Sequence, residues 1–157
     1  MVLFLYLLMN GIAIIFFMRK KKELHILEIL AYWFFASYVA QNFSALFYMN
    51  FKNLYIPEKL SFEFSHFISR ITLYPLLMVL FLDYYLKANN LVRKLLLMLG
   101  FVVLLTSIEW LNHFLGVLVH KNWQFWWSPA IWFAGLLLLI GFMKIFRILL
   151  FRGGEYK

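Results

Sequence analysis

The sequence predicts an all-α fold, a polytopic membrane bundle of five transmembrane helices with the N-terminus outside and the C-terminus in the cytoplasm. Three observations carry this prediction. Of the 157 residues, 65% are hydrophobic and only 14% are charged, whereas soluble domains are about half apolar and a quarter charged. Five long apolar stretches follow one another along the chain. A run of four basic residues ends the first stretch, and the length suits a single transmembrane domain.

Each apolar stretch is long enough to cross a bilayer, which takes about 20 residues with about 17 to 25 tolerated. The stretches are residues 2–18, 26–49, 64–86, 95–117 and 129–150. The second and third contain polar interruptions but stay mostly apolar. The first is not a cleavable signal peptide, because its positive charges follow the apolar run and do not precede it. We therefore expect five retained spans.

The basic residues predict the orientation, because Arg and Lys beside a span are retained on the cytoplasmic side. If the spans alternate after the run at residues 19–22, eleven basic residues are cytoplasmic and three are outside. The cytoplasmic ones are Arg19, Lys20, Lys21, Lys22, Lys87, Arg93, Lys94, Lys144, Arg147, Arg152 and Lys157, and the outer ones are Lys52, Lys59 and Lys121. This asymmetry predicts a multi-pass protein of the cell membrane.

The net charge of +8 follows from the same distribution. Basic clusters beside a membrane attract anionic lipid headgroups. We therefore expect membrane lipids as partners at the cytoplasmic face and no nucleic acid. A partner membrane protein or a second copy of the chain is a further possibility that the sequence leaves open.

Two prolines affect the geometry of the later spans. Ser128 followed by Pro129 predicts a helix N-cap at the start of the fifth span. Pro75 lies inside the third span, where the missing N–H predicts a kink. Trp123, Trp126 and Trp127 precede the fifth span and are typical of an aromatic anchor at headgroup level.

An ion pair is predicted inside the membrane. Arg70 lies roughly 9 Å below the outer start of the third span, and Glu109 lies roughly 12 Å from the outer end of the fourth. Ionisable groups in hydrocarbon usually face the bundle interior and pair with one another. We therefore expect Arg70 and Glu109 to meet at the same depth.

Further polar side chains fall in the same outer half of the bundle. Residues three, four or seven apart lie on one side of a helix. Glu63, His66 and Arg70 therefore share one face of the third span, and Glu109 and His113 share one face of the fourth. This polar cluster comprises Arg70 and Glu109 together with Asn10, Gln41, Asn42, Glu63, His66, Asn112 and His113.

Three interpretations of the polar cluster remain open. It is an interhelical clamp that fixes helix order, or it is the pocket of a small-molecule binding or transport module, lined by Arg, Glu and His, in which Arg70 holds a carboxylate or phosphate. In the third, His66, His113, Glu63 and Glu109 are weak candidates for metal or catalytic groups. No catalytic motif is present, so we expect an accessory or ligand-sensing component and assign no enzyme activity, catalytic residue or cofactor.

Two acidic residues lie toward the cytoplasmic side. Glu28 and Asp83 are near the ends of their spans. We expect each of them to pair with basic residues of the neighbouring loops.

The last third of the chain resembles a known family. The matching residues are Ile108-Glu109-Trp110, Gly116, Lys121-Asn122-Trp123 and Trp126-Trp127-Ser128. They are similar to the C-terminal half of a family of small, uncharacterised multi-pass membrane proteins of spore-forming Gram-positive bacteria. The resemblance implies a bacterial membrane protein and implies no activity.

Overall fold

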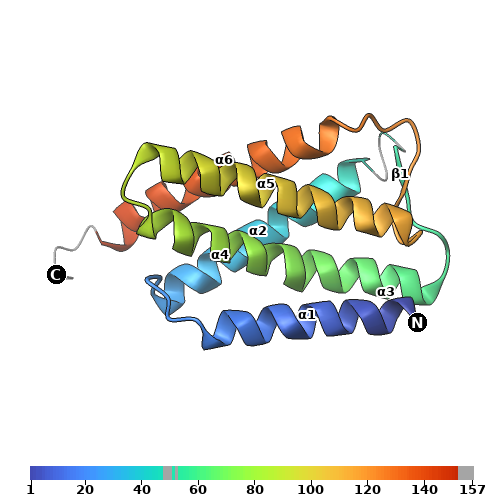
Figure 1. Cartoon of the computed structure of the whole chain (residues 1–157), viewed down its shortest axis with the longest axis horizontal. Helices are drawn as coiled ribbons and strands as arrows, with labels where there is room; N and C mark the ends of the chain where they lie inside the picture. The colour runs from blue at the N-terminus through green and yellow to red at the C-terminus, as the bar shows by residue number, and fades with distance from the viewer. Residues whose placement is uncertain (48–50, 52, 152–157) are drawn as a thin grey trace.

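The computed structural model describes residues 1–47, 51 and 53–151, and these fold into long helices with one pair of short strands (Figure 1). The elements in order are α1 (Val2–Arg19), α2 (Ile26–Ala45), β1 (Leu54–Tyr55), α3 (Leu60–Ile68), the π-helical segment η2 (Ser69–Leu73), α4 (Tyr74–Lys87), α5 (Leu91–Phe114), β2 (Val119–His120) and α6 (Trp127–Leu150). Met49, the predicted end of the second span, and the basic residues Lys52, Arg152 and Lys157 lie outside the described residues.

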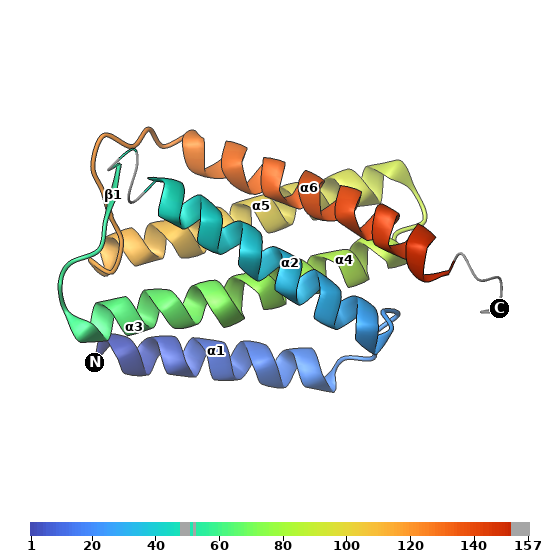
Figure 2. The same cartoon turned by 180° about the vertical axis from the view of Figure 1, so that it is seen from behind.

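The rod formed by α3, η2 and α4 is the centre of the bundle. It runs without interruption over 28 residues, and 67% of its most apolar window is buried. α2 packs on α4 and α6, α5 packs on α4 and α6, and α1 packs on α3 and η2. Figure 2 shows α2 crossing obliquely over α4, with α1 along one edge. The other helices are buried mainly on the sides that they turn toward this rod.

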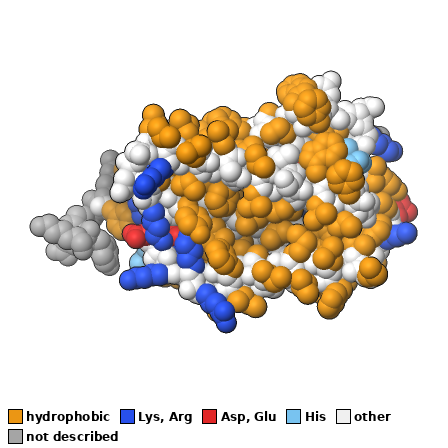
Figure 3. All heavy atoms as spheres, in the orientation of Figure 1, with side chains coloured by type: hydrophobic (Ala, Val, Ile, Leu, Met, Phe, Trp, Pro, Cys, Tyr) orange, Lys and Arg blue, Asp and Glu red, His pale blue; other side chains and the backbone are white. Residues whose placement is uncertain are grey.

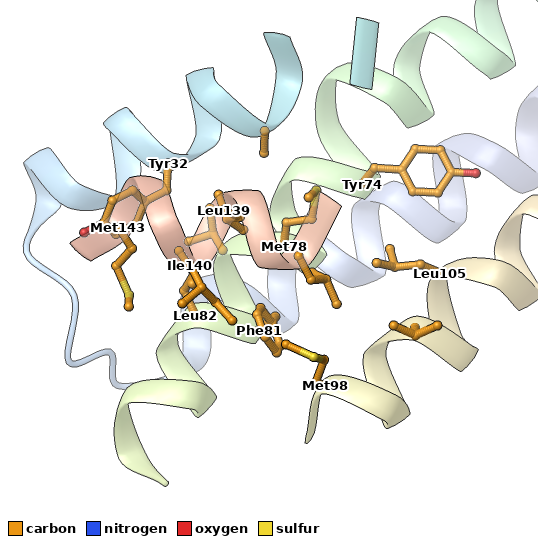
Figure 4. Close-up of a cluster of buried hydrophobic side chains, with 14 of the residues drawn as sticks. Tyr32, Tyr74, Met78, Phe81, Leu82, Met98, Leu105, Leu139, Ile140 and Met143 are labelled. Carbon is orange, nitrogen blue, oxygen red and sulfur yellow. The ribbon is translucent and has the colours of Figure 1, made fainter. Parts of the chain in front are cut away.

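The hydrophobic core lies around α4. Met78, Phe81 and Leu82 of α4 contact a cluster of buried side chains from α2, α5 and α6 (Figure 4). In the same view the Tyr74 ring points away from this cluster, toward the end of the bundle that carries the N-terminus. Phe35 of α2 stacks on Phe142 of α6 with ring centroids 4.1 Å apart. These contacts hold α2 and α6 against α4.

Four of the described helical segments are long and apolar enough to cross a membrane. They are α1, the rod Leu60–Lys87, α5 and α6. Their outer surfaces carry exposed Leu, Ile, Val and Phe side chains, and Figure 3 shows this apolar belt with Lys and Arg gathered mainly at the end that carries the C-terminus. Such a surface is typical of a membrane protein. α2 is not one of the four, because Glu28, Gln41 and Asn42 lower its mean hydropathy.

Helix ends follow local chemistry more closely than hydropathy. α2 begins at a capping box, in which the His25 side chain accepts from the backbone N–H of Leu27 and Glu28 accepts from that of His25. α5 begins at Leu91, four residues before the predicted start, because the Asn90 side chain accepts a hydrogen bond from the N–H of Arg93. Hydropathy alone does not register such caps.

Pro75 changes the helix in front of it. Pro75 has no N–H to continue the α-helical ladder, and its ring crowds the carbonyl four residues earlier. The segment before Pro75 is the π-helix η2, in which the N–H of Tyr74 donates to the carbonyl of Ser69, five residues earlier. Because a π turn takes up more residues than an α turn, residues four apart stay nearly in line through this segment.

Buried carboxylates tie the helices together at the end that carries the C-terminus. Glu28 accepts from Arg147 Nε at 2.5 Å and from the Tyr32 hydroxyl at 3.0 Å. Asp83 lies 3.2 Å from Lys20 Nζ and 2.9 Å from Lys87 Nζ. The predicted pairing of Glu28 and Asp83 with basic groups is confirmed, although Arg147 belongs to α6 and Lys87 to the end of α4, and only Lys20 lies in a loop.

At the opposite end, β1 and β2 join two connections. Leu54 pairs with His120 and Tyr55 with Val119 in antiparallel register. The N–H of Lys121 donates to the carbonyl of Asn53 at 2.8 Å and extends this pair. Leu54 and Leu118 are buried beneath it. The strand pair therefore covers this end of the bundle.

Candidate functional site

A cavity of about 130 Å³ lies in the half of the bundle that carries the strand pair. The rod contributes His66, Arg70, Tyr74 and Met78 to its wall. These four side chains are spaced by four residues, and η2 keeps them on one face of the rod. α2 and α6 form the sides of the cavity, and Glu109 of α5 completes it.

Arg70 and His66 bring unpaired nitrogens to this cavity. Arg70 Nε and His66 Nδ1 are buried, and neither has a hydrogen-bond partner among the described residues. His66 is only 3% exposed. The two residues are four apart, so their Cβ atoms lie about 5–6 Å from each other. Buried polar nitrogens are normally hydrogen-bonded, so this pair of nitrogens requires an explanation.

Glu109, by contrast, is fully engaged with α6. The Ser128 hydroxyl donates to Oε1 at 2.7 Å, and Trp132 Nε1 donates to Oε2 at 2.7 Å. The ring of His120 approaches Oε1 to 3.4 Å through Nε2, a close contact without hydrogen-bond geometry. Ser128 also accepts from Trp123 Nε1 at 2.9 Å. The Glu109 carboxylate thus connects α5, β2 and the start of α6.

The predicted ion pair between Arg70 and Glu109 is wrong. Both residues line the cavity, but the ion pairs of the described residues do not join them. The reason lies in their neighbours. η2 packs against α1 and α2, whereas the Glu109 carboxylate is turned toward donors of α6. Equal depth placed the two residues at one level, but equal depth does not determine which way each side chain points.

Asn112 links three helices beside the cavity. Its Oδ1 accepts a short hydrogen bond from the Tyr6 hydroxyl of α1. Its Nδ2 donates to the Tyr74 hydroxyl at 2.8 Å. Tyr6, Tyr74 and Asn112 are all buried. This chain of hydrogen bonds is an interhelical clamp.

The remaining residues of the predicted polar cluster lie away from the cavity wall. Asn10 is buried and donates to the carbonyl of Tyr6 at 2.7 Å. Asn42 is exposed and donates to the carbonyl of Tyr38, while Gln41 is half-buried beside it. His113 Nδ1 accepts from the N–H of His120 at 3.1 Å. These contacts are local and do not converge with Arg70.

The metal alternative finds no support in this arrangement. Among the described residues, no group of three or more His, Asp or Glu side chains could hold a metal ion. Glu63 is exposed in a shallow hollow between α2 and α3. His66 faces the cavity, and the His113 ring is stacked on that of His120 with centroids 4.7 Å apart. The four candidate ligands therefore lie in different surroundings.

Sequence reasoning missed several residues of the site. Ser128 was predicted as an N-cap, but α6 begins at Trp127 and the Ser128 hydroxyl binds Glu109. Trp132 follows Ser128 by four residues, and Tyr74 follows Arg70 by four. Because residues four apart are neighbours on a helix, this spacing could have placed Trp132 and Tyr74 in the site. His120 lies in a two-residue strand, for which the sequence carries no periodic signal.

Comparison of the chain with protein-family models, with curated proteins and with solved structures finds no match.

Proposed function

We propose that the protein crosses the membrane five times, with its N-terminus outside and its C-terminus in the cytoplasm. In this proposal α2 crosses the membrane in addition to the four segments of spanning length. The 20 residues of α2 extend about 30 Å, the thickness of a bilayer core. α2 also packs on α4, the second half of the rod Leu60–Lys87, and on α6, and both the rod and α6 are of spanning length. The gathering of Lys and Arg at one end of the bundle (Figure 3) favours the cytoplasm for that end and anionic lipid headgroups around it.

Single cysteines test this topology, because the chain has no Cys of its own. Lys21→Cys and Lys59→Cys lie at exposed positions before and after α2. With a membrane-impermeant maleimide on intact cells, we expect labelling of Lys59→Cys alone, and labelling of Lys21→Cys only after lysis. Labelling of both variants from the same side would exclude a crossing by α2.

For the function itself, we infer that the protein is a ligand-binding, accessory or sensing component, and that its ligand presents an anionic group to Arg70 and His66. The observation that carries this inference is the pair of buried nitrogens without partners in one cavity. A buried polar nitrogen without a hydrogen-bond partner is costly. An anionic group on a bound ligand would supply the missing partner, and a guanidinium holds carboxylates and phosphates by parallel hydrogen bonds.

The interhelical clamp and the binding pocket, two interpretations of the polar cluster, then apply to different residues. Glu109 and Asn112 have protein partners for their polar atoms, which favours a clamp. Arg70 Nε and His66 Nδ1 have no hydrogen-bond partner among the described residues, which favours binding of a ligand. The cavity lies between these two groups.

Arg70→Gln separates binding from a structural role. If Arg70 awaits a ligand, removing the unpaired charge leaves the melting temperature of the ligand-free protein unchanged or higher. Native mass spectra of protein purified in mild detergent should show an acidic species retained by the unmodified protein and lost in Arg70→Gln. Arg93→Gln, which changes an exposed cation, is the control and should retain it. A lower melting temperature with unchanged retention would make Arg70 structural.

A further inference from the structure

We propose that the ligand of this cavity is a long-chain carboxylate drawn from the membrane, with its headgroup on Arg70 and His66 and its hydrocarbon chain extending out between α2 and α6. This inference rests on the proposed ligand-binding role and names the class of molecule that is bound. Four features of the cavity support it.

The first feature is the composition of the wall. Away from the polar groups already described, the cavity is lined by hydrocarbon, including Val39, Phe43, Met78, Ile131 and Leu138. A small hydrated anion gains little from such a wall, because apolar surface offers it no hydrogen bonds. An alkyl chain, in contrast, gains from every methylene that it buries.

The second feature is the size. The cavity of about 130 Å³ is close to the volume of about 150 Å³ that accepts a benzene molecule in an engineered protein. It can therefore hold a headgroup and a few carbons. A longer chain has to leave the cavity and lie along the outer surface of the bundle.

The third feature is the direction of the opening. The strand pair covers the outer end, where Leu54 and Leu118 are 8% and 5% exposed. On the side, Ala134 and Leu138 line the cavity and are exposed on α6. Small residues, Ala40 of α2 and Gly135 of α6, flank this side. The cavity is therefore covered at the end that carries the strand pair and borders the exposed apolar surface of α6.

A second hollow meets the cavity at Ser44 and Arg70. It lies between α2 and α3 and also borders Phe64 and Phe67, which are exposed apolar side chains. Arg70 can thus be reached from the surface of the bundle that faces the membrane interface. A headgroup lying at that level can move along this hollow to the guanidinium.

The fourth feature is the charge of the wall. Arg70 offers one positive charge, and Glu109 places a carboxylate on the same cavity. A ligand with two negative charges would be repelled by that carboxylate. The geometry therefore favours a monoanion.

Binding of defined probes to the purified full chain in detergent tests the proposal. The probes are palmitate, its uncharged methyl ester, acetate as the headgroup without a chain, and a lysophosphatidic acid as the phosphate monoester. Native mass spectrometry reports the adducts, and the melting temperature is followed against probe concentration. We expect saturable binding of palmitate, at least tenfold weaker binding of the other three, and at least tenfold weaker palmitate binding by Arg70→Gln.

Variants of α6 test the position of the chain. Gly135→Leu fills the apolar part of the cavity without changing Arg70 and should weaken palmitate binding at least tenfold. Gly141→Leu adds the same bulk on α6 where a Cβ meets nothing within 4 Å, and should bind as the unmodified protein does. Gly135→Ala, whose Cβ meets only Met78 Cε at 3.9 Å, checks that a side chain at this position is compatible with folding.

Each other outcome overturns a defined part of the argument. Acetate binding that depends on Arg70 and matches palmitate would overturn the long-chain ligand and leave the ligand-binding role intact. Tighter binding of lysophosphatidic acid than of palmitate would overturn the carboxylate. Equal palmitate binding by the unmodified protein and Arg70→Gln would mean simple partitioning and would contradict both proposals. Absence of binding by every probe would overturn the long-chain carboxylate alone.

Discussion

Arg70 and Glu109 line the same cavity but are not paired with each other, because the Glu109 carboxylate is bound by Ser128 and Trp132 of α6. The polar cluster is thus divided between a carboxylate with hydrogen-bond partners and a guanidinium whose buried Nε has none among the described residues. This division leads to opposite expectations for the two residues when they are mutated.

A double-mutant cycle should find Glu109 coupled more strongly to Trp132 than to Arg70. Residues in contact couple by about 0.5–3 kcal/mol, and Trp132 donates a hydrogen bond to the Glu109 carboxylate. We expect a coupling in this range for Glu109→Gln with Trp132→Phe and a smaller one for Glu109→Gln with Arg70→Gln, because those two residues share the cavity without an ion pair. Unfolding free energies from SDS titration in mixed micelles give both. A large coupling between Arg70 and Glu109 would mean that the two side chains meet in the folded protein.

Arg147→Ala should destabilise the bundle strongly. Glu28 is 1% exposed, but the Arg147 side chain is 34% exposed, so water screens part of the interaction. Leaving the buried carboxylate without this donor should cost about 1–3 kcal/mol, less than the loss for a fully buried pair. Adding Glu28→Gln to Arg147→Ala should recover part of that loss, because the unpaired charge is then gone. The same titration measures the effect.

Lys144→Ala is the control for that experiment, since Lys144 is exposed on the same helix. Surface substitutions of this kind change stability by about 0.5 kcal/mol or less. If Arg147→Ala behaved like Lys144→Ala, the contact with Glu28 would contribute nothing to stability.

Asn112→Leu should weaken the attachment of α1. The substitution leaves the hydroxyls of Tyr6 and Tyr74 without their common partner. Interhelical hydrogen bonds in membranes contribute about 0.6–2 kcal/mol each, so Tyr6→Phe should cost that amount and Asn112→Leu more. Tyr38→Phe changes an exposed tyrosine and should leave the melting temperature unchanged. An equal effect of Tyr6→Phe and Tyr38→Phe would rule out the clamp.

Gly116→Ala and Gly141→Ala should have effects of opposite sign. Gly116 ends α5 at φ 70°, with the N–H groups of Gly116 and Val117 donating to the carbonyls of His113 and Asn112. An alanine in this left-handed conformation costs about 1–2 kcal/mol. Gly141 lies inside α6 with open space at its Cβ, where alanine should stabilise by about 0.5–1 kcal/mol. Melting temperatures that shift in the same direction would contradict the turn at Gly116.

The sequence predicted the helices well because hydropathy and helix length are local properties. The expected segment 2–18 became Val2–Arg19, and 129–150 became Trp127–Leu150. Ends set by caps were missed by up to four residues, as at Asn90 and Leu91, since a cap depends on one side chain and contributes little to a hydropathy average. The effect of Pro75 was predicted as a kink, and the observed π-helical segment follows from the same missing N–H.

The sequence by itself determined that polar residues gather in one half of the bundle, because depth along a helix follows from counting residues. Only the tertiary structure decided which of them meet. The packing of α6 brought Ser128 and Trp132 to Glu109, the β1–β2 pair brought His120 beside them, and the rod placed His66 and Arg70 in the wall of one cavity. The physical reason is that the partner of a side chain depends on the rotation and tilt of whole helices, which packing sets over long distances along the chain.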